Sequence, residues 1–506
     1  MKFSALKVHQ WHEEWDKVEY DPTKKRGKPE PYFYLFTIPA LTLRRLCGVY
    51  ARSVEERKGA KEDPNIQRPH MPKRSEDISK YVQYGYPFYE LSERDKKNPE
   101  HDGLRKPGWL PTAIVVNVLT STDERKGTKR VHESDLIQLN EDHILIPDGS
   151  NNTDWRPKEL PPIEVIDGQH RLWAFDDKEL LSESFEIPVV AFHGLDLSWQ
   201  AYLFYSINIK PKKISPSLAY DLYPLLRTED WLDSTKTGHK VYREARAQEI
   251  VDCLWAHLES PWYHRISMLG ESINKKKIIT QSAWIRSLLA SLLGKADKNI
   301  FAGGGIFNAL QQNNSLFANS WNLYEQVAFL ILIGNSLSKK ALESSPFWIN
   351  TKIKSLKQAA MYIFENDTCL LSQDQGIRAF LYILNGFFSI DKNLTILENT
   401  KISFDSDDDS EFVDRLDKIS NTLEIFQDKS ELISLVDGLT DVLIKFDWRS
   451  SKAEKLTDEE KSLKASFRGS GGYKALRIEL LKFLKDKSHD STIVHFAQST
   501  LKTPEE

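Results

Sequence analysis

The hydrophobic pattern of the chain changes near residue 230. Before that point, short apolar runs rich in β-branched and aromatic residues alternate with charged or turn-forming stretches, which is typical of strands. These predicted strands cover residues 31–41, 113–119, 143–147, 163–166 and 187–192. Because the run at 113–119 is almost continuously apolar, we expect it to be covered on both faces.

Helical spacing of apolar residues accompanies these strands and later replaces them. Before residue 230, it predicts helices over residues 41–55, 74–82, 172–175, 199–208 and 216–226. Beyond residue 230, strand signals fade and helical spacing recurs, for example at 250–258 and 284–293. We therefore expect a first half of the α+β or α/β class and a mainly α-helical second half.

Length and local composition suggest how the chain divides. A chain of 506 residues is too long for one typical core, so two or three domains are expected. The first residues are polar and charged, and an acidic stretch at 404–411 suggests a linker. The predicted parts are an N-terminal extension (1–29), an α/β domain (30–230), a helical domain (231–400) and a C-terminal helical segment (401–506).

Composition and charge narrow the classes of function. Hydrophobic residues make up 40% of the chain, which argues against bulk disorder. The net charge of −4 gives no general attraction to nucleic acid, so a DNA partner would require a local basic surface. The 3 cysteines lack zinc-site or redox spacing and indicate buried thiols. Without a signal-peptide pattern or a membrane-length apolar run, we expect a cytoplasmic protein with no membrane partner.

The segment richest in chemistry is Asp167-Gly168-Gln169-His170-Arg171, between a predicted strand and a predicted helix. Gly168 would let a ligand approach the backbone, and the helix N-terminus that follows favours anions. The fork of donors on Arg171 suits phosphate oxygens, and Gln169 and His170 add further donors. Asp167 could cap the helix or hold a metal ion that bridges phosphates. The competing interpretation is an ordinary structural turn, because a strand, an Asp-Gly turn and a helix occur widely.

Residues 166–174, Ile-Asp-Gly-Gln-His-Arg-Leu-Trp-Ala, resemble two related families. They reproduce the pentapeptide that names the DGQHR-domain family, and they are similar to the Gly-Glu-Arg-Arg box of ParB-type CTPases. Gln67 and Arg68, followed by the predicted helix 74–82, resemble the first conserved element of these domains. Asn208, followed by Lys210 and Lys213, resembles the third element, although the family glutamate before the asparagine is absent. The resemblance covers about residues 30–230.

The resemblance implies a ParB-like module with a mixed sheet that binds a nucleoside triphosphate, ATP being the first choice, together with Mg²⁺. Gly168 would admit the phosphates, and Asp167 or Asn208 would orient Mg²⁺. Gln169 or His170 would orient the attacking water in a hydrolysis reaction. The phosphates would be bound by basic and amide side chains, namely Gln67, Arg68, Arg171, Asn208, Lys210 and Lys213.

The same resemblance implies an accessory role in a prokaryotic DNA-modification or phage-defence system. DndB-like regulators of phosphorothioation and DpdB-like partners of 7-deazaguanine modification enzymes represent this family. The implied partners are DNA, a DNA-modifying enzyme, or further copies of the chain in a homo-oligomer. A non-enzymatic DNA-binding regulator with the same fold is the alternative. A nuclease-linked sensor is a weaker third hypothesis, because the chain contains no His-Asn-His motif.

A second glycine-rich motif lies at residues 467–472 and loosely resembles the C-terminal parts of some DGQHR proteins, as does the segment 279–284. Gly469 to Gly472, flanked by Arg468 and Lys474, could bind an anion. On sequence alone, we favour the interpretation as a flexible turn.

Overall fold

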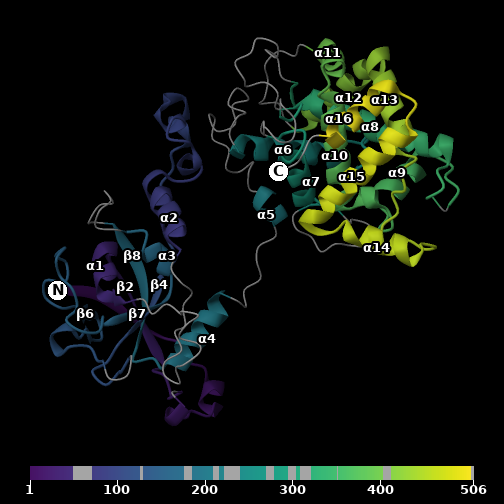
Figure 1. Cartoon of the computed structure of the whole chain (residues 1–506). Helices are drawn as coiled ribbons and strands as arrows, with labels where there is room; N and C mark the ends of the chain where they lie inside the picture. The colour runs from purple at the N-terminus through teal and green to yellow at the C-terminus, as the bar shows by residue number, and fades with distance from the viewer. Residues whose placement is uncertain are drawn as a thin grey trace. The chain divides into compact units, whose positions relative to one another are not determined.

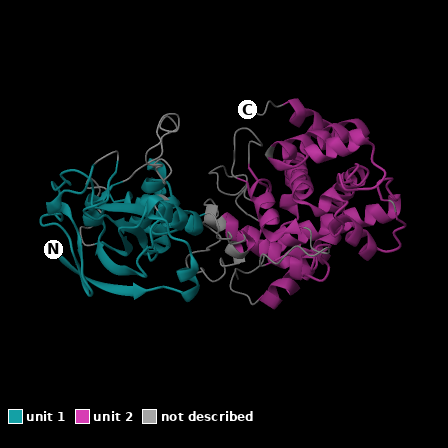
Figure 2. Cartoon of the chain, turned by 90° about the horizontal axis from the view of Figure 1, so that it is seen from below, with its two compact units in different colours: residues 1–213 teal, residues 214–506 magenta. Residues whose placement is uncertain are grey.

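The computed structural model describes residues 1–24, 26–48, 71–125, 129–175, 185–208, 216–221, 240–268, 279–294, 304–307, 321–349, 351–402 and 412–502. The chain folds into two compact units, residues 1–213 and residues 214–506 (Figures 1 and 2). The first unit contains a sheet, and the second is mainly helical. The residues that we single out for nucleotide binding belong to the first unit.

The first unit is built on a mixed eight-stranded sheet with the strand order β3-β7-β4-β8-β2-β1-β6-β5. The pairs β3–β7 and β4–β8 are parallel, and the other neighbours are antiparallel. The mixed sheet expected for this half is therefore present. Its strands are β1 (Lys2–His9), β2 (Tyr32–Pro39), β3 (Cys47–Gly48), β4 (Ile114–Val118), β5 (Gln138–Leu139), β6 (His143–Leu145), β7 (Ile163–Asp167) and β8 (Glu186–His193).

The apolar runs of the sequence form the central strands, as predicted. Residues 163–166 of β7 are all buried, and β4 buries four of its five residues, as a strand covered on both faces requires. The strand β1 was not predicted, because its exposed residues alternate with half-buried ones and its sequence is half polar. It pairs with β2 and β6, so the sheet unit includes the segment that the sequence sets apart as an N-terminal extension.

Four helices accompany the described part of this sheet: α1 (Ala40–Leu46), α2 (Pro72–Tyr84), α3 (Gln169–Leu172) and α4 (Leu197–Asn208). Both α1 and α2 contact α3, whereas α4 packs against β7 (Figure 1). The helix predicted over 41–55 ends at Leu46, where the chain turns into β3, and residues 49–55 lie outside the described residues. The helix predicted over 172–175 is wrong in its bounds, because α3 begins directly after Gly168 and ends at Leu172.

The second unit is mainly helical, as expected, and contains one short parallel strand pair, β9 (Ile266–Ser267) with β10 (Ile279–Thr280). The described helices are α5 (Pro216–Asp221), α6 (Lys240–Ala256), α7 (Gln281–Leu289), α8 (Leu323–Ser344), α9 (Leu356–Phe364), α10 (Asp374–Phe388), α11 (Asp391–Asn399), α12 (Phe412–Gln427), α13 (Ser430–Leu443), α14 (Asp458–Ser466), α15 (Gly469–Lys487) and α16 (Ser491–Lys502).

Residues before and after position 400 share one hydrophobic core in this unit. The helix α8 lies inside that core, and Asn322 and Glu325 form a capping box at its start. The carboxylate of Glu325 also accepts a hydrogen bond from the backbone N–H of Ile402 at 2.7 Å. The two helical segments expected from the sequence are thus joined in a single compact unit.

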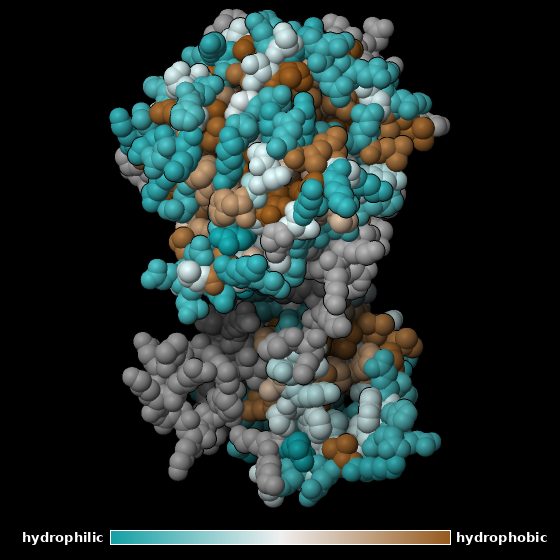
Figure 3. Space-filling view, turned by 90° about the vertical axis from the view of Figure 1, so that its right-hand side faces the viewer, coloured by the Kyte–Doolittle hydropathy of each residue, from teal (hydrophilic) through white to brown (hydrophobic). Residues whose placement is uncertain are grey.

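Large apolar side chains are concentrated inside each unit. Polar side chains cover most of the face displayed in Figure 3, with apolar side chains in smaller groups between them. The three cysteines are free and buried, as their spacing predicted. Among the described helices, none combines the length and the apolar character needed to cross a membrane.

Candidate functional site

A glycine turn joins β7 to α3 and shapes the candidate site. Gly168 has a φ of 94°, in the left-handed region that favours glycine. A Cβ atom at this position would lie 2.6 Å from Cδ1 of Ile114 and 3.0 Å from Nη2 of Arg171. The missing side chain therefore makes room for the arginine of the same motif. The helix N-terminus after Gly168 was expected to favour anions, but α3 has only four residues, so its dipole is weak.

Two of the predicted site residues, Arg171 and Asn208, contact a third, Asp167. Nη2 of Arg171 donates a hydrogen bond to Oδ2 of Asp167 at 3.0 Å, and Nδ2 of Asn208 donates one to Oδ1 at 3.0 Å. The side chains of Asp167 and Arg171 are each 20% exposed, so the pair lies at the surface. The C-terminal end of α4 thus reaches the DGQHR turn from 41 residues away.

Arg171 is also held by backbone of the segment before β4. Its Nη1 donates hydrogen bonds to the carbonyl and the hydroxyl of Thr112 and, at 3.3 Å, to the carbonyl of Ala113. The guanidinium is therefore engaged by protein acceptors. A phosphate could bind it only by competing with them or by using its remaining exposed edge.

Gln169 and His170 occupy different environments within the turn. Gln169 is 8% exposed, and its buried Nε2 has no hydrogen-bond acceptor among the described residues. Leaving an amide donor buried without an acceptor costs about 1–3 kcal/mol, which an incoming oxygen acceptor would recover. The backbone carbonyl of His170 accepts a hydrogen bond from Ser75 on α2 at 3.1 Å. Within the described part of the chain, Gln169 is therefore buried with a free donor, and its role towards an attacking water stays a prediction.

Four predicted phosphate-binding residues, Gln67, Arg68, Lys210 and Lys213, lie outside the described residues. In the part of the chain that the structure describes, no group of three or more His, Cys, Asp or Glu side chains could hold a metal ion. The hydrogen bond to Asp167 turns the amide nitrogen of Asn208, not its oxygen, towards the carboxylate, so Asp167 is the metal ligand that this geometry offers. Magnesium in nucleotide sites takes one or two protein ligands and completes its shell with phosphates and water. A single carboxylate fits that arrangement and does not fit an independent metal site.

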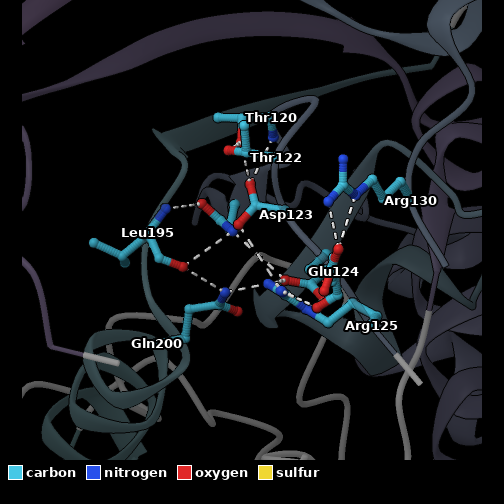
Figure 4. Close-up of polar contacts among 10 residues, drawn as sticks. Thr120, Thr122, Asp123, Glu124, Arg125, Arg130, Leu195 and Gln200 are labelled. Carbon is cyan, nitrogen blue, oxygen red and sulfur yellow. Dashed lines mark hydrogen bonds and ion pairs between the residues drawn. The ribbon is translucent and has the colours of Figure 1, made fainter. Parts of the chain in front are cut away.

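A buried polar network behind the site was not predicted (Figure 4). Glu164 on β7 accepts two hydrogen bonds from Arg125, at 2.7 and 2.9 Å, and one from Nε2 of Gln200 on α4, at 3.0 Å. Asn117 on β4 accepts from the backbone N–H of Leu195 at 2.8 Å. Each of these four polar side chains belongs to a residue less than 10% exposed. The network fastens α4 to β7 and β4, and so fixes the helix that ends in Asn208.

The sequence does contain a signal for this network. Glu164 and Asn117 each interrupt an otherwise apolar strand, and a polar side chain in a buried strand requires a hydrogen-bonding partner. The partners themselves, Arg125 and Gln200, carry no such mark.

No match to a known family, a curated protein or a solved structure is found for this chain.

Proposed function

We propose that the chain is a nucleotide-binding, NTP-hydrolysing accessory protein of a prokaryotic DNA-modification or defence system. Its site would be the turn at residues 167–171 of a ParB-like module, with ATP and Mg²⁺ as the first candidates. DNA, a DNA-modifying enzyme, or further copies of the chain would be its partners. The observation that carries this proposal is the convergence of Arg171 and Asn208 on Asp167, within the glycine turn that the sequence singles out.

The hydrogen bonds at Asp167 suggest how the site would respond to its ligand. Asp167 is neutralised by Arg171 and bonded by Asn208. Asp167, with or without the Asn208 amide oxygen, would hold the Mg²⁺ of a metal–nucleotide complex, and Arg171 would donate hydrogen bonds to phosphate oxygens. Each of the two charged side chains would then keep a partner of opposite charge.

The bound nucleotide would supply the phosphoryl group that is transferred to water. Arg171 would stabilise the negative charge that develops on the phosphate oxygens, and Asp167 would position the phosphates. His170 is the candidate for orienting the water. Gly168 would keep the backbone close to the ligand, because it carries no Cβ.

Thermal-shift measurements with ATP, GTP and CTP in the presence of Mg²⁺ test the proposal. A nucleotide that binds only the folded chain at about 100 times its Kd should stabilise it by about 2.7 kcal/mol. Arg171→Ala and Asn208→Ala should each remove the nucleotide-induced rise in Tm relative to their own ligand-free Tm. Arg130→Ala is the matched control, because Arg130 is 53% exposed and pairs with Glu124 away from this turn. A wild-type Tm that no nucleotide changes would refute the proposal.

One observation favours the alternative of a non-enzymatic DNA-binding regulator. The guanidinium of Arg171 already has protein acceptors on both of its terminal nitrogens, as a purely structural role requires. A phosphate-release assay separates the two functions. The wild type should release phosphate from a nucleoside triphosphate and Arg171→Ala should not. Tight DNA binding by a wild type that never turns over nucleotide would establish the regulator instead.

A further inference from the structure

Three helices of the second unit meet at one carboxylate, at the start of α10. Asp374 is the first residue of α10, and its Oδ2 accepts a hydrogen bond from the hydroxyl of Tyr473 on α15 at 2.8 Å. Nη2 of Arg286 on α7 lies 3.7 Å from the same oxygen. The segments 279–284 and 467–472, which both loosely resemble C-terminal parts of DGQHR proteins, contain the starts of α7 and α15, the two helices that contact α10 here (Figure 1).

Several arginines lie where α7, α10 and α15 meet. Arg378 lies one turn beyond Asp374, with its guanidinium carbon 4.6 Å from the centre of the Tyr473 ring. Arg477 lies one turn beyond Tyr473 and stacks on Tyr382 at 4.1 Å. Burial lowers the pKa of Arg477, the phenol of Tyr382 raises it, and the positive charge of Arg378 lowers it.

The described ion pairs compensate the charge of Arg286 and Arg378 only in part. Arg286 makes one long ion pair with Asp374 and is 53% exposed, and no ion pair of Arg378 is found within the described residues. Asp374 itself is already hydrogen-bonded to Tyr473. Arg286 and Arg378 therefore keep guanidinium N–H donors from which a further anion could accept hydrogen bonds.

The start of α15 is open at two of its three glycines, whereas a Cβ added at Gly472 would lie 2.1 Å from the backbone of Phe467. Gly469 has a φ of 75°, and a Cβ added at Gly469 or at Gly471 would meet nothing within 4 Å. The side chain of Arg468 at the N-cap does not cap the helix, and Arg468 is exposed. The N-terminal N–H groups of this 19-residue helix, which carries Tyr473 in its second turn, add donors for an anion.

We propose that Arg286, Arg378 and Arg468 form a binding surface for the phosphate groups of duplex DNA. The planar fork of a guanidinium matches the two free oxygens of a phosphodiester. Cations contributed by three separate segments suit a ligand with several phosphates in a row. The choice of DNA over other phosphate carriers rests on the proposed function, whereas the surface itself uses no residue of the nucleotide site.

Fluorescence anisotropy with a short labelled DNA duplex tests this surface in the full chain. The variant Arg286→Gln/Arg378→Gln should bind the duplex about tenfold more weakly or worse. The slope of log Kd against log salt concentration should fall by about 1.8, because about 0.9 is lost with each phosphate contact. Lys482→Gln is the matched control on α15, since Lys482 is 55% exposed and pairs with Glu479. It should bind as the wild type does.

Three further measurements separate the possible failures. Equal Tm values for the double variant and the wild type establish that weaker binding does not come from unfolding. Arg171→Ala should keep its affinity for the duplex even where it loses the nucleotide response, so the two sites fail independently. Sodium phosphate should compete with the duplex better than sodium chloride at equal ionic strength. The proposal is overturned if the wild type fails to bind the duplex, or if the double variant keeps the wild-type Kd and salt slope.

Discussion

Replacing Glu164 by Gln tests how the sheet unit holds its buried network together. The change keeps the size of the side chain and removes its charge, which leaves Arg125 buried at 8% exposure without its main partner. Removing one member of a buried ion pair costs about 3–5 kcal/mol. Asp123 lies 3.9 Å from the guanidinium of Arg125 and compensates part of the charge, so we expect about 3 kcal/mol, the lower end of that range.

This loss should appear as a lower Tm of the sheet unit in differential scanning calorimetry of the full chain. For a unit of this size, each kcal/mol shifts Tm by roughly 2–4 °C, so Glu164→Gln should lower it by roughly 6–12 °C. The double variant Arg125→Met/Glu164→Gln should regain part of the loss, because no buried charge remains. Lys80→Gln, which breaks an exposed ion pair with Glu76, is the control and should cost less than about 1 kcal/mol. A shift for Glu164→Gln no larger than for Lys80→Gln would refute the reasoning.

Three further predictions concern the turn, the acid range and the thiols. Gly168→Ala forces an L-residue to a φ of 94°, so it should cost about 1–3 kcal/mol and abolish any nucleotide-induced rise in Tm; an unchanged Tm contradicts this. Burial raises the pKa of Asp447, but hydrogen bonds and charge from Arg449 and Lys464 outweigh burial and hold it below 3.8. Its stabilisation is therefore present above pH 3.8 and lost as the pH falls through the lowered pKa, and Asp447→Asn should flatten the Tm-against-pH curve there. Burial raises the pKa of every thiol, so a thiol reagent at neutral pH should label none in the folded chain and all after unfolding: Cys47, Cys253 and Cys369.

The sequence predicts the core strands of the fold because apolar side chains report burial directly. The strands β2, β4, β7 and β8 and the helical second unit follow from the spacing of such residues. The strand β1 does not, because none of its residues is fully buried: polar residues make up half of it, and even Leu6 is 63% exposed. Its place in the sheet comes from hydrogen bonds to its neighbours. Hydrogen bonding between strands leaves no mark in side-chain polarity.

The sequence singles out Asp167 and Arg171 as polar residues of one turn, but it does not show that Asn208, 41 positions after Asp167, meets them. The engagement of Arg171 by Thr112 and Ala113 could not be predicted, since two of those acceptors are backbone carbonyls that any residue would provide. The partners of Glu164 could not be predicted either, because Arg125 and Gln200 come from other parts of the chain and reach β7 only in the folded unit.

The position of β8 in the sheet has a consequence for how the chain is made. This strand is the last of the eight in sequence, yet it lies between β4 and β2 and pairs with both. During synthesis, the half-sheets on either side must therefore wait with unpaired edges until residue 193 has left the ribosome. Such exposed edges invite aggregation, so yield on expression should depend strongly on temperature and on chaperones that shield nascent strands.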